Sequence, residues 1–191
     1  ERPTSFGHVV VDEAQDLSPM QCRAIARRSE HGSLTVLGDL AQGTAPWATA
    51  SWAESLAHLG KPDGRVIPLT TGFRVPGAVL VLANALLPAL AVDVPAAVSL
   101  RSDGELRTDL VSSASSLSGA VVAAVRRALA AEGSVGVIAP DAAVPALHAT
   151  LRRAGIETAT ADEVETATRV TLLPATVAKG LEYDHVVLVE P

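Results

Sequence analysis

The chain has 191 residues, of which 48% are hydrophobic, and its formal net charge at pH 7 is −6. The hydrophobic share supports buried cores and excludes a disordered chain. The negative charge excludes a broad basic surface, so any nucleic-acid contact must be local. The longest apolar run, residues 78–92, is interrupted by Asn84 and Pro88 and falls short of the ~20 residues that a membrane span needs. A single cysteine, Cys22, and the lack of a signal peptide favour a cytoplasmic protein.

The apolar run at residues 9–11 ends in two carboxylates, Asp12 and Glu13. Such a run is typical of a buried parallel strand, and α/β folds bind ligands at the carboxyl ends of such strands. There Asp12 can hold Mg²⁺ through water, and Glu13 can accept the proton of an attacking water. This pattern resembles the Walker B half of an ATPase. The phosphate-binding half, Gly-x-x-x-x-Gly-Lys-Ser/Thr, does not occur in the 191 residues, so the chain alone is expected to be inactive.

The remaining residues alternate helices and strands in the pattern of an α/β fold. Capping boxes at Ser18 and Ser51 predict the starts of two helices. The expected helices are 19–30, 52–59, 76–90, 117–131 and 142–154, and the expected strands are 34–37, 65–69, 134–139, 169–173 and 185–189. Residues 92–116 have no strong period. We place a boundary at the start of the strand expected at 65–69, which gives two α/β domains, 1–66 and 67–191.

Polar loops follow several of these strands. Gln42 can hydrogen-bond a γ-phosphate and report its presence, or it is a loop glutamine in solvent. Trp47 and Trp52 are the only tryptophans. An exposed tryptophan can stack on unpaired bases at ~1–3 kcal/mol per base. We expect Trp52, on its helix, to be a core residue, whereas Trp47 lies in a loop where either role is open.

Two further loops carry basic residues. Arg74 follows the strand expected at 65–69, and its planar guanidinium suits the charge of a transferring phosphate, although a surface salt bridge is the alternative. Residues 179–182, Lys-Gly-Leu-Glu, form a tight loop that can meet sugar, phosphate or a nucleic-acid backbone, or an ordinary polar turn.

Together these segments resemble motifs II to V of UvrD/Rep-type superfamily 1 helicases, in order and spacing: DEAQD at 12–16, GDLAQ at 38–42, GFR at 72–74 and KGLE at 179–182. The resemblance spans essentially the whole chain. It implies an α/β protein with two RecA-like parallel-sheet domains, both incomplete in a fragment from the middle of a longer protein. In that family, ATP hydrolysis in the cleft between the domains drives movement on single-stranded nucleic acid.

Carried over residue by residue, the resemblance implies specific roles and the cofactors ATP and Mg²⁺. The catalytic set is Glu13, Gln42 and Arg74. The nucleotide is held by Asp12, Gln15, Asp39, Gly180 and Glu182, with Mg²⁺ at Asp12 through water. The residues expected to contact nucleic acid are Trp47, Thr176 and Lys179.

Three features of this sequence differ from the UvrD/Rep-type pattern and indicate one branch of the family. Thr176 stands where the family has a histidine or its equivalent, and the interval between Arg74 and Lys179 has no room for the large insertion of UvrD. Residues 43–47, Gly-Thr-Ala-Pro-Trp, replace the usual isoleucine-tyrosine. These features resemble the helicase IV/HelD-like branch, whose bacterial members bind RNA polymerase and release it from nucleic acid.

Two functions therefore stay open. The first is an ATP-driven helicase or translocase on single-stranded DNA, associated with the nucleoid. The second is an ATPase that releases or recycles RNA polymerase and does not unwind duplex. A RecA-like fold that binds nothing is disfavoured, because Asp12, Glu13, Gln42 and Arg74 are all present.

Overall fold

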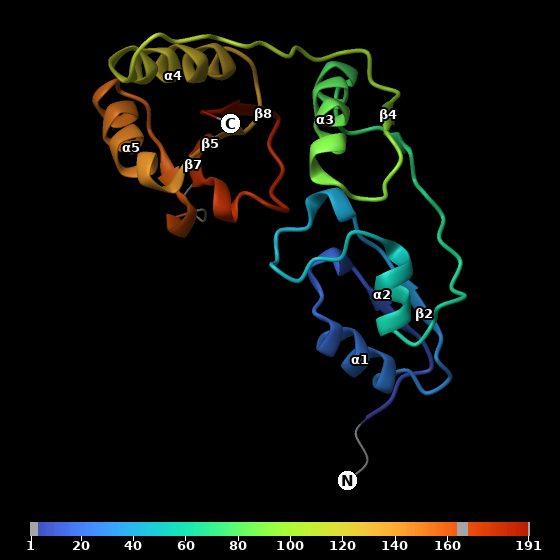
Figure 1. The fold of residues 1–191 in the computed structure, drawn as a ribbon. Coiled ribbons are helices and arrows are strands. Elements are labelled where there is room, and N and C mark those ends of the chain that lie inside the picture. The colour runs from blue at the N-terminus through green and yellow to red at the C-terminus, as the bar shows by residue number, and fades with distance from the viewer. Residues whose placement is uncertain (1–3, 164–167, 191) are drawn as a thin grey trace. The chain divides into compact units, whose positions relative to one another are not determined.

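The structure, a computed structural model, describes residues 4–163 and 168–190 (Figure 1). It divides into two compact units, Glu1–Arg107 and Thr108–Pro191. All strand pairs named below are parallel, so the expected α/β fold with parallel sheets is confirmed. The assignment of RecA-like domains and their boundary at 66/67 stay predictions. The ends of those predicted domains, residues 1–3 and 191, and residues 164–167 lie outside the described residues.

The first unit contains two small sheets and three α-helices. Its elements are β1 (Val9–Val11), η1 (Ala14–Asp16), α1 (Pro19–Arg28), β2 (Leu34–Val36), η2 (Leu40–Gln42), α2 (Trp52–His58), β3 (Thr71–Gly72), α3 (Gly77–Leu90) and β4 (Val98–Ser99). In the first sheet Val9 pairs with Leu34 and Val11 with Val36. In the second sheet β3 pairs with β4. The helices expected at 19–30, 52–59 and 76–90 and the strand at 34–37 are thus confirmed, with ends shifted by a few residues. The burial expected for the strand at 9–11 is wrong, because β1 and β2 are only partly buried and Val10 is 63% exposed.

The start of α1 follows from its sequence. The Ser18 hydroxyl accepts a hydrogen bond from the Gln21 backbone, and the Gln21 side chain accepts one from the Ser18 N–H at 2.8 Å. Pro19 occupies the first turn, where a missing N–H costs nothing. Cys22 is buried on this helix, and burial raises the pKa of its thiol. It packs as a small hydrophobic residue.

The apolar helix α3 precedes β4 in the first unit. Its Asn84, which interrupts the apolar run, exchanges two hydrogen bonds with the backbone of Ala97, at 2.8 and 3.1 Å, next to β4. The hydrogen bonds of Asn84 therefore connect α3 to the start of β4, which accounts for a polar residue in the apolar run. In the ranges 4–163 and 168–190, no helix combines the length and apolar character needed to cross a membrane.

The second unit is built on a four-stranded sheet in the order β6-β7-β5-β8. Its elements are α4 (Ala114–Leu129), β5 (Val135–Ala139), η3 (Asp141–Ala143), α5 (Val144–Arg153), β6 (Ala159–Thr160), η4 (Ala161–Glu163), β7 (Val170–Pro174), η5 (Ala175–Val177) and β8 (His185–Leu188). This confirms the helices expected at 117–131 and 142–154 and the strands expected at 134–139, 169–173 and 185–189. Parallel strands need crossover connections, and α5 lies in the one between β5 and β6, whereas α4 precedes β5.

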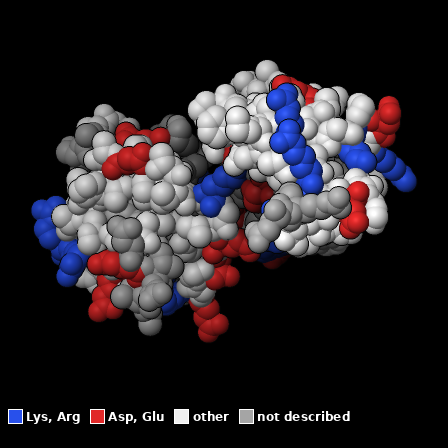
Figure 2. Space-filling model, turned by 90° about the horizontal axis from the view of Figure 1, so that it is seen from below, with Lys and Arg blue, Asp and Glu red and all other residues white. Residues whose placement is uncertain are grey.

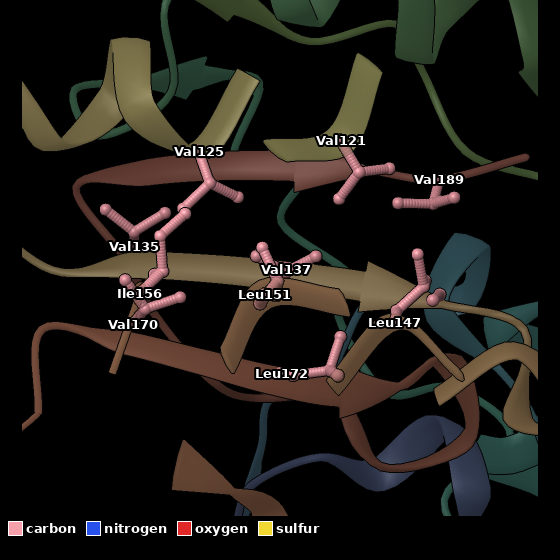
Figure 3. Packing of buried hydrophobic residues seen from close by; sticks show 11 residues of the cluster. Val121, Val125, Val135, Val137, Leu147, Leu151, Ile156, Val170, Leu172 and Val189 are labelled. Carbon is pink, nitrogen blue, oxygen red and sulfur yellow. The ribbon is translucent and has the colours of Figure 1, made fainter. Parts of the chain in front are cut away.

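The core of this unit lies between helices and sheet. Figure 3 shows Val121 and Val125 of α4 and Leu151 of α5 meeting Val137 of β5 and Leu172 of β7. All five are buried. At the amino ends of the strands, the N–H and hydroxyl of Ser134 donate to Asp184 at 2.7 and 2.9 Å and hold the pKa of that carboxyl below its usual value.

The strand expected at 65–69 is wrong. The first strand of this region, β3, begins only at Thr71, and Leu69 is 85% exposed. Pro68 accounts for the difference, because it has no N–H to give to a ladder. The short strands β4 and β6 were not expected, since two residues carry no recognisable period. Helix α4 starts earlier than predicted because Ser113 and Ser116 form a capping box.

The buried position of Leu172 gives a stability prediction. Leu172 is 0% exposed in the core, so Leu172→Ala should lower the free energy of unfolding by about 2–5 kcal/mol through lost burial and a cavity. Leu110, in the same unit, is 96% exposed, and Leu110→Ala should change the value by less than about 0.5 kcal/mol. Urea denaturation followed by circular dichroism measures both. Equal effects of the two substitutions would contradict this core.

Candidate functional site

The parallel pairing of β1 and β2 brings acids from two separate segments to one edge. Beyond the last paired residues, the Leu37 N–H donates to the Val11 carbonyl at 2.8 Å, and the Ala14 N–H donates to the Leu37 carbonyl at 3.0 Å. The chain then continues into Asp12 and Glu13 after β1 and into Asp39 after β2. We call Asp12, Glu13, Asp16 and Asp39 the acidic edge. It lies at the carboxyl end of the sheet, where ligand sites of α/β folds form.

Glu13 has a left-handed backbone conformation, with φ 53° and ψ 37°. Residues other than glycine rarely adopt it, and such strain costs ~1–3 kcal/mol and clusters at functional sites. The Glu13 N–H donates to Asp12 Oδ1 at 2.9 Å, which ties the two acids together. The left-handed residue therefore turns the chain directly after Asp12, and the hydrogen bond joins the two acids at this turn.

Gln15 lies behind these acids and is 2% exposed. Its Nε2 donates to Glu13 Oε2 at 2.6 Å, and its Oε1 accepts from the backbone N–H of Asp39 at 3.1 Å. The carboxamide thus spans the two strand ends. Gly38 makes room for it, because a Cβ at this position would lie 2.6 Å from Gln15 Oε1.

The Asp39 carboxylate organises the short helix η2. It accepts from the Ala41 N–H at 3.0 Å and from Gln42 Nε2 at 2.7 Å. Gln42 therefore lies at the same edge as Glu13, and the predicted residues Asp12, Glu13, Gln15, Asp39 and Gln42 are brought together.

The third acid of the first motif, Asp16, anchors the following loop. Its Oδ1 accepts from the backbone N–H groups of Thr44 at 2.8 Å and Ala45 at 3.0 Å. The Trp47 indole N–H donates to the Asp16 carbonyl at 2.8 Å, and Trp47 is 51% exposed. Trp47 is thus a fixed, half-exposed ring, whereas Trp52, expected in the core, is only partly buried at the start of α2.

In the second unit, polar residues gather at the carboxyl ends of β5 and β7. Thr176, in η5 after β7, donates to Asp141 Oδ1 at 2.9 Å, and Asp141 begins η3, two residues after the end of β5. Sequence reasoning missed Asp141, although an acid just after an apolar strand is the same signal that identified Asp12. Gly180 has φ 78°, a conformation that favours glycine in the turn before Glu182.

Arg74 follows β3, and its carbonyl accepts from Arg101 Nη1 at 2.7 Å. Arg101 is itself held by Asp103 through two hydrogen bonds. The approach of Arg74 to a nucleotide, and that of Thr176, Lys179, Gly180 and Glu182 of the second unit, stay predictions.

Within the described part of the chain, no group of three or more histidine, cysteine, aspartate and glutamate side chains is arranged to hold a metal ion. Comparison of the sequence with models of known protein families and with curated proteins gives no match.

The anchoring by Asp16 can be tested with the chain itself. Asp16→Ala removes the acceptor of the Thr44 and Ala45 N–H groups, so their hydrogen exchange should accelerate by about tenfold or more, since bonds to charged groups contribute ~1.5–3 kcal/mol. Asp63, exposed in a turn of the same unit, supplies the control Asp63→Ala. Unchanged exchange at both amides in Asp16→Ala would contradict the anchor. Amide exchange measured by NMR reads out each residue.

Proposed function

We propose that the acidic edge is the hydrolytic half of an ATP site, and that the protein uses ATP hydrolysis to move on single-stranded nucleic acid. The observation that supports this most is the arrangement of Glu13: a carboxylate on a strained turn at a strand end, held by a buried carboxamide and joined to Asp12. A carboxylate that is held in one orientation by its backbone and by a buried hydrogen-bond donor is typical of a general base.

In the proposed reaction Glu13 acts on water. The water oxygen attacks the γ-phosphorus, the bond from that phosphorus to the bridging oxygen breaks, and ADP leaves. The proton released by the water passes to Glu13. Gln42 and Arg74 are proposed to contact the γ-phosphate, where the guanidinium fork of Arg74 stabilises the spreading negative charge. Asp39, Gly180 and Glu182 are proposed to complete the nucleotide site.

The residues at the edge fit Mg²⁺ held mainly by water and phosphate. Mg²⁺ prefers oxygen ligands and is commonly bound by one or two carboxylates plus substrate phosphates, so a dense cluster of protein ligands is not needed. Asp12, exposed at the end of β1, supplies such an oxygen. When bound, the ion neutralises phosphate charge.

For nucleic acid we propose local contacts by Trp47, Thr176 and Lys179. The half-exposed ring of Trp47 is held in place, and it can stack on an unpaired base without being ordered first. On the face drawn in Figure 2, the Lys and Arg side chains of the described residues lie in separate groups. A local stacking contact suits this distribution better than a broad electrostatic surface.

The release or recycling of RNA polymerase is the second candidate, because the Gly43–Trp47 segment resembles the helicase IV/HelD-like branch. It would use the same hydrolytic residues. Adding single-stranded DNA or RNA polymerase to the intact protein separates the two proposals, since the true partner should stimulate ATP turnover.

The role of Glu13 gives the decisive test. In the intact protein, Glu13→Gln keeps the shape of the side chain but removes the base, so ATP turnover should fall by at least ~10²-fold while ATP binding changes little. Glu30→Gln, at an exposed position in the same unit, is the control and should match the unaltered protein. Steady-state turnover and nucleotide titration are the measurements. Parental turnover by Glu13→Gln would overturn the proposed function.

Gln42 and Arg74 are proposed to meet the same phosphate, so their effects should be coupled. The double variant Gln42→Ala/Arg74→Ala should lose less than the sum of the single losses in log kcat, because each single change already disrupts the shared contact. Turnover of the four proteins in the cycle measures the coupling. Strict additivity would mean that the two residues act independently.

A further inference from the structure

We propose that Gln15 is a positioning residue, which orients the Glu13 carboxylate and links it to the loop that carries Gln42. The inference rests on the proposed function for the role of Glu13, but the hydrogen bonds that carry it belong to the chain itself. The resemblance implied that Gln15 holds the nucleotide. Its burial and its two protein partners favour an action through Glu13 instead.

The orientation of the Gln15 carboxamide follows from its partners. The backbone N–H of Asp39 can only donate, so it faces the amide oxygen, at 3.1 Å. The amide nitrogen then faces Glu13 Oε2 at 2.6 Å, and an ionised carboxylate can only accept. Reversing the amide would set donor against donor and acceptor against acceptor. The two strand ends therefore determine the orientation of this side chain.

Local backbone features serve this contact. The left-handed conformation of Glu13 folds the chain so that a side chain only two residues later reaches its carboxylate. On the other strand, Gly38 leaves the space that Gln15 Oε1 occupies, since a Cβ there would lie 2.6 Å away. The left-handed residue Glu13 and the glycine at position 38 thus both accommodate one buried carboxamide.

The contact is also part of a longer chain of hydrogen bonds. Gln42 donates to the Asp39 carboxylate at 2.7 Å, the Asp39 N–H donates to Gln15, and Gln15 donates to Glu13. If the Gln42 loop moved and displaced the Asp39 backbone, Gln15 would move with it and change the orientation of the Glu13 carboxylate. This arrangement gives a physical route by which a phosphate contact at Gln42 adjusts the base.

Kinetics of the intact protein test the positioning role. Gln15→Leu removes both hydrogen bonds and should lower kcat by about 10- to 100-fold, with the KM for ATP within about threefold, because a misplaced catalytic group loses rate and not substrate affinity. Gln15→Glu keeps an acceptor for Asp39 but replaces the donor by an oxygen. Its kcat should also fall, and the acidic limb of its pH profile should move to higher pH, because two adjacent carboxylates retain a proton more strongly.

The matched control is Gln21→Leu, which removes a carboxamide that caps α1 in the same unit and should leave kcat within about twofold. Glu13→Gln is assayed beside it. If Glu13→Gln keeps parental turnover, the proposed function fails. If Glu13→Gln loses turnover while both Gln15 variants keep parental kcat and pH profile, the positioning role alone is overturned.

A second measurement needs neither a variant nor ATP. In the 191-residue chain labelled with ¹⁵N, the side-chain NH₂ of Gln15 should exchange with solvent at least about tenfold more slowly than that of Gln21, because it is buried and bonded to a carboxylate. Exchange as fast as at Gln21, which is exposed, would overturn the proposal even if Gln15→Leu failed to fold.

Discussion

The acidic edge depends on the parallel register of β1 and β2. Only when Val11 lies opposite Val36 does the Asp39 N–H face Gln15 and the Leu37 carbonyl face Ala14. A shift by one residue would turn every side chain of a strand to the opposite face of the sheet. The parallel register of these short strands therefore sets the positions of the polar groups that follow them.

A buried carboxamide is a demanding way to join two strand ends. Left without partners, the polar atoms of Gln15 would each cost roughly 1–3 kcal/mol of desolvation. Both ends are satisfied, by Glu13 and by Asp39. An apolar residue of the same volume would avoid this desolvation cost, but it could not donate a hydrogen bond to a carboxylate. Together with the strain at Glu13, this points to a site where local stability is given up for the placement of one charged group.

Much of the fold could be predicted, because apolar runs and capping residues act over short distances. The strand before Asp12 and the helix after Ser18 are examples, and the failure at 65–69 traces to Pro68 within an apolar run. The contacts within the candidate site could not be predicted from the sequence in the same way. Gln15 reaches Glu13 only because of a left-handed residue, and Thr176 meets Asp141 across 35 positions of sequence. The sequence pattern singled out Glu13, Gln15 and Thr176 but not Asp141, and the hydrogen-bond partners of all of them depend on the path of the backbone.

The charge of the edge limits how it can serve a nucleotide. Asp12, Glu13, Asp16 and Asp39 all carry carboxylates, and a polyphosphate brought near them meets like charge. Asp16 and Asp39 both accept hydrogen bonds from backbone N–H groups of the segment that follows β2. The opposing charge for the phosphates must then come from cations. We therefore propose that Asp12 holds Mg²⁺ and that the guanidinium of Arg74 contacts the γ-phosphate. In this proposal an acid takes the proton of water, and positive groups hold the ATP.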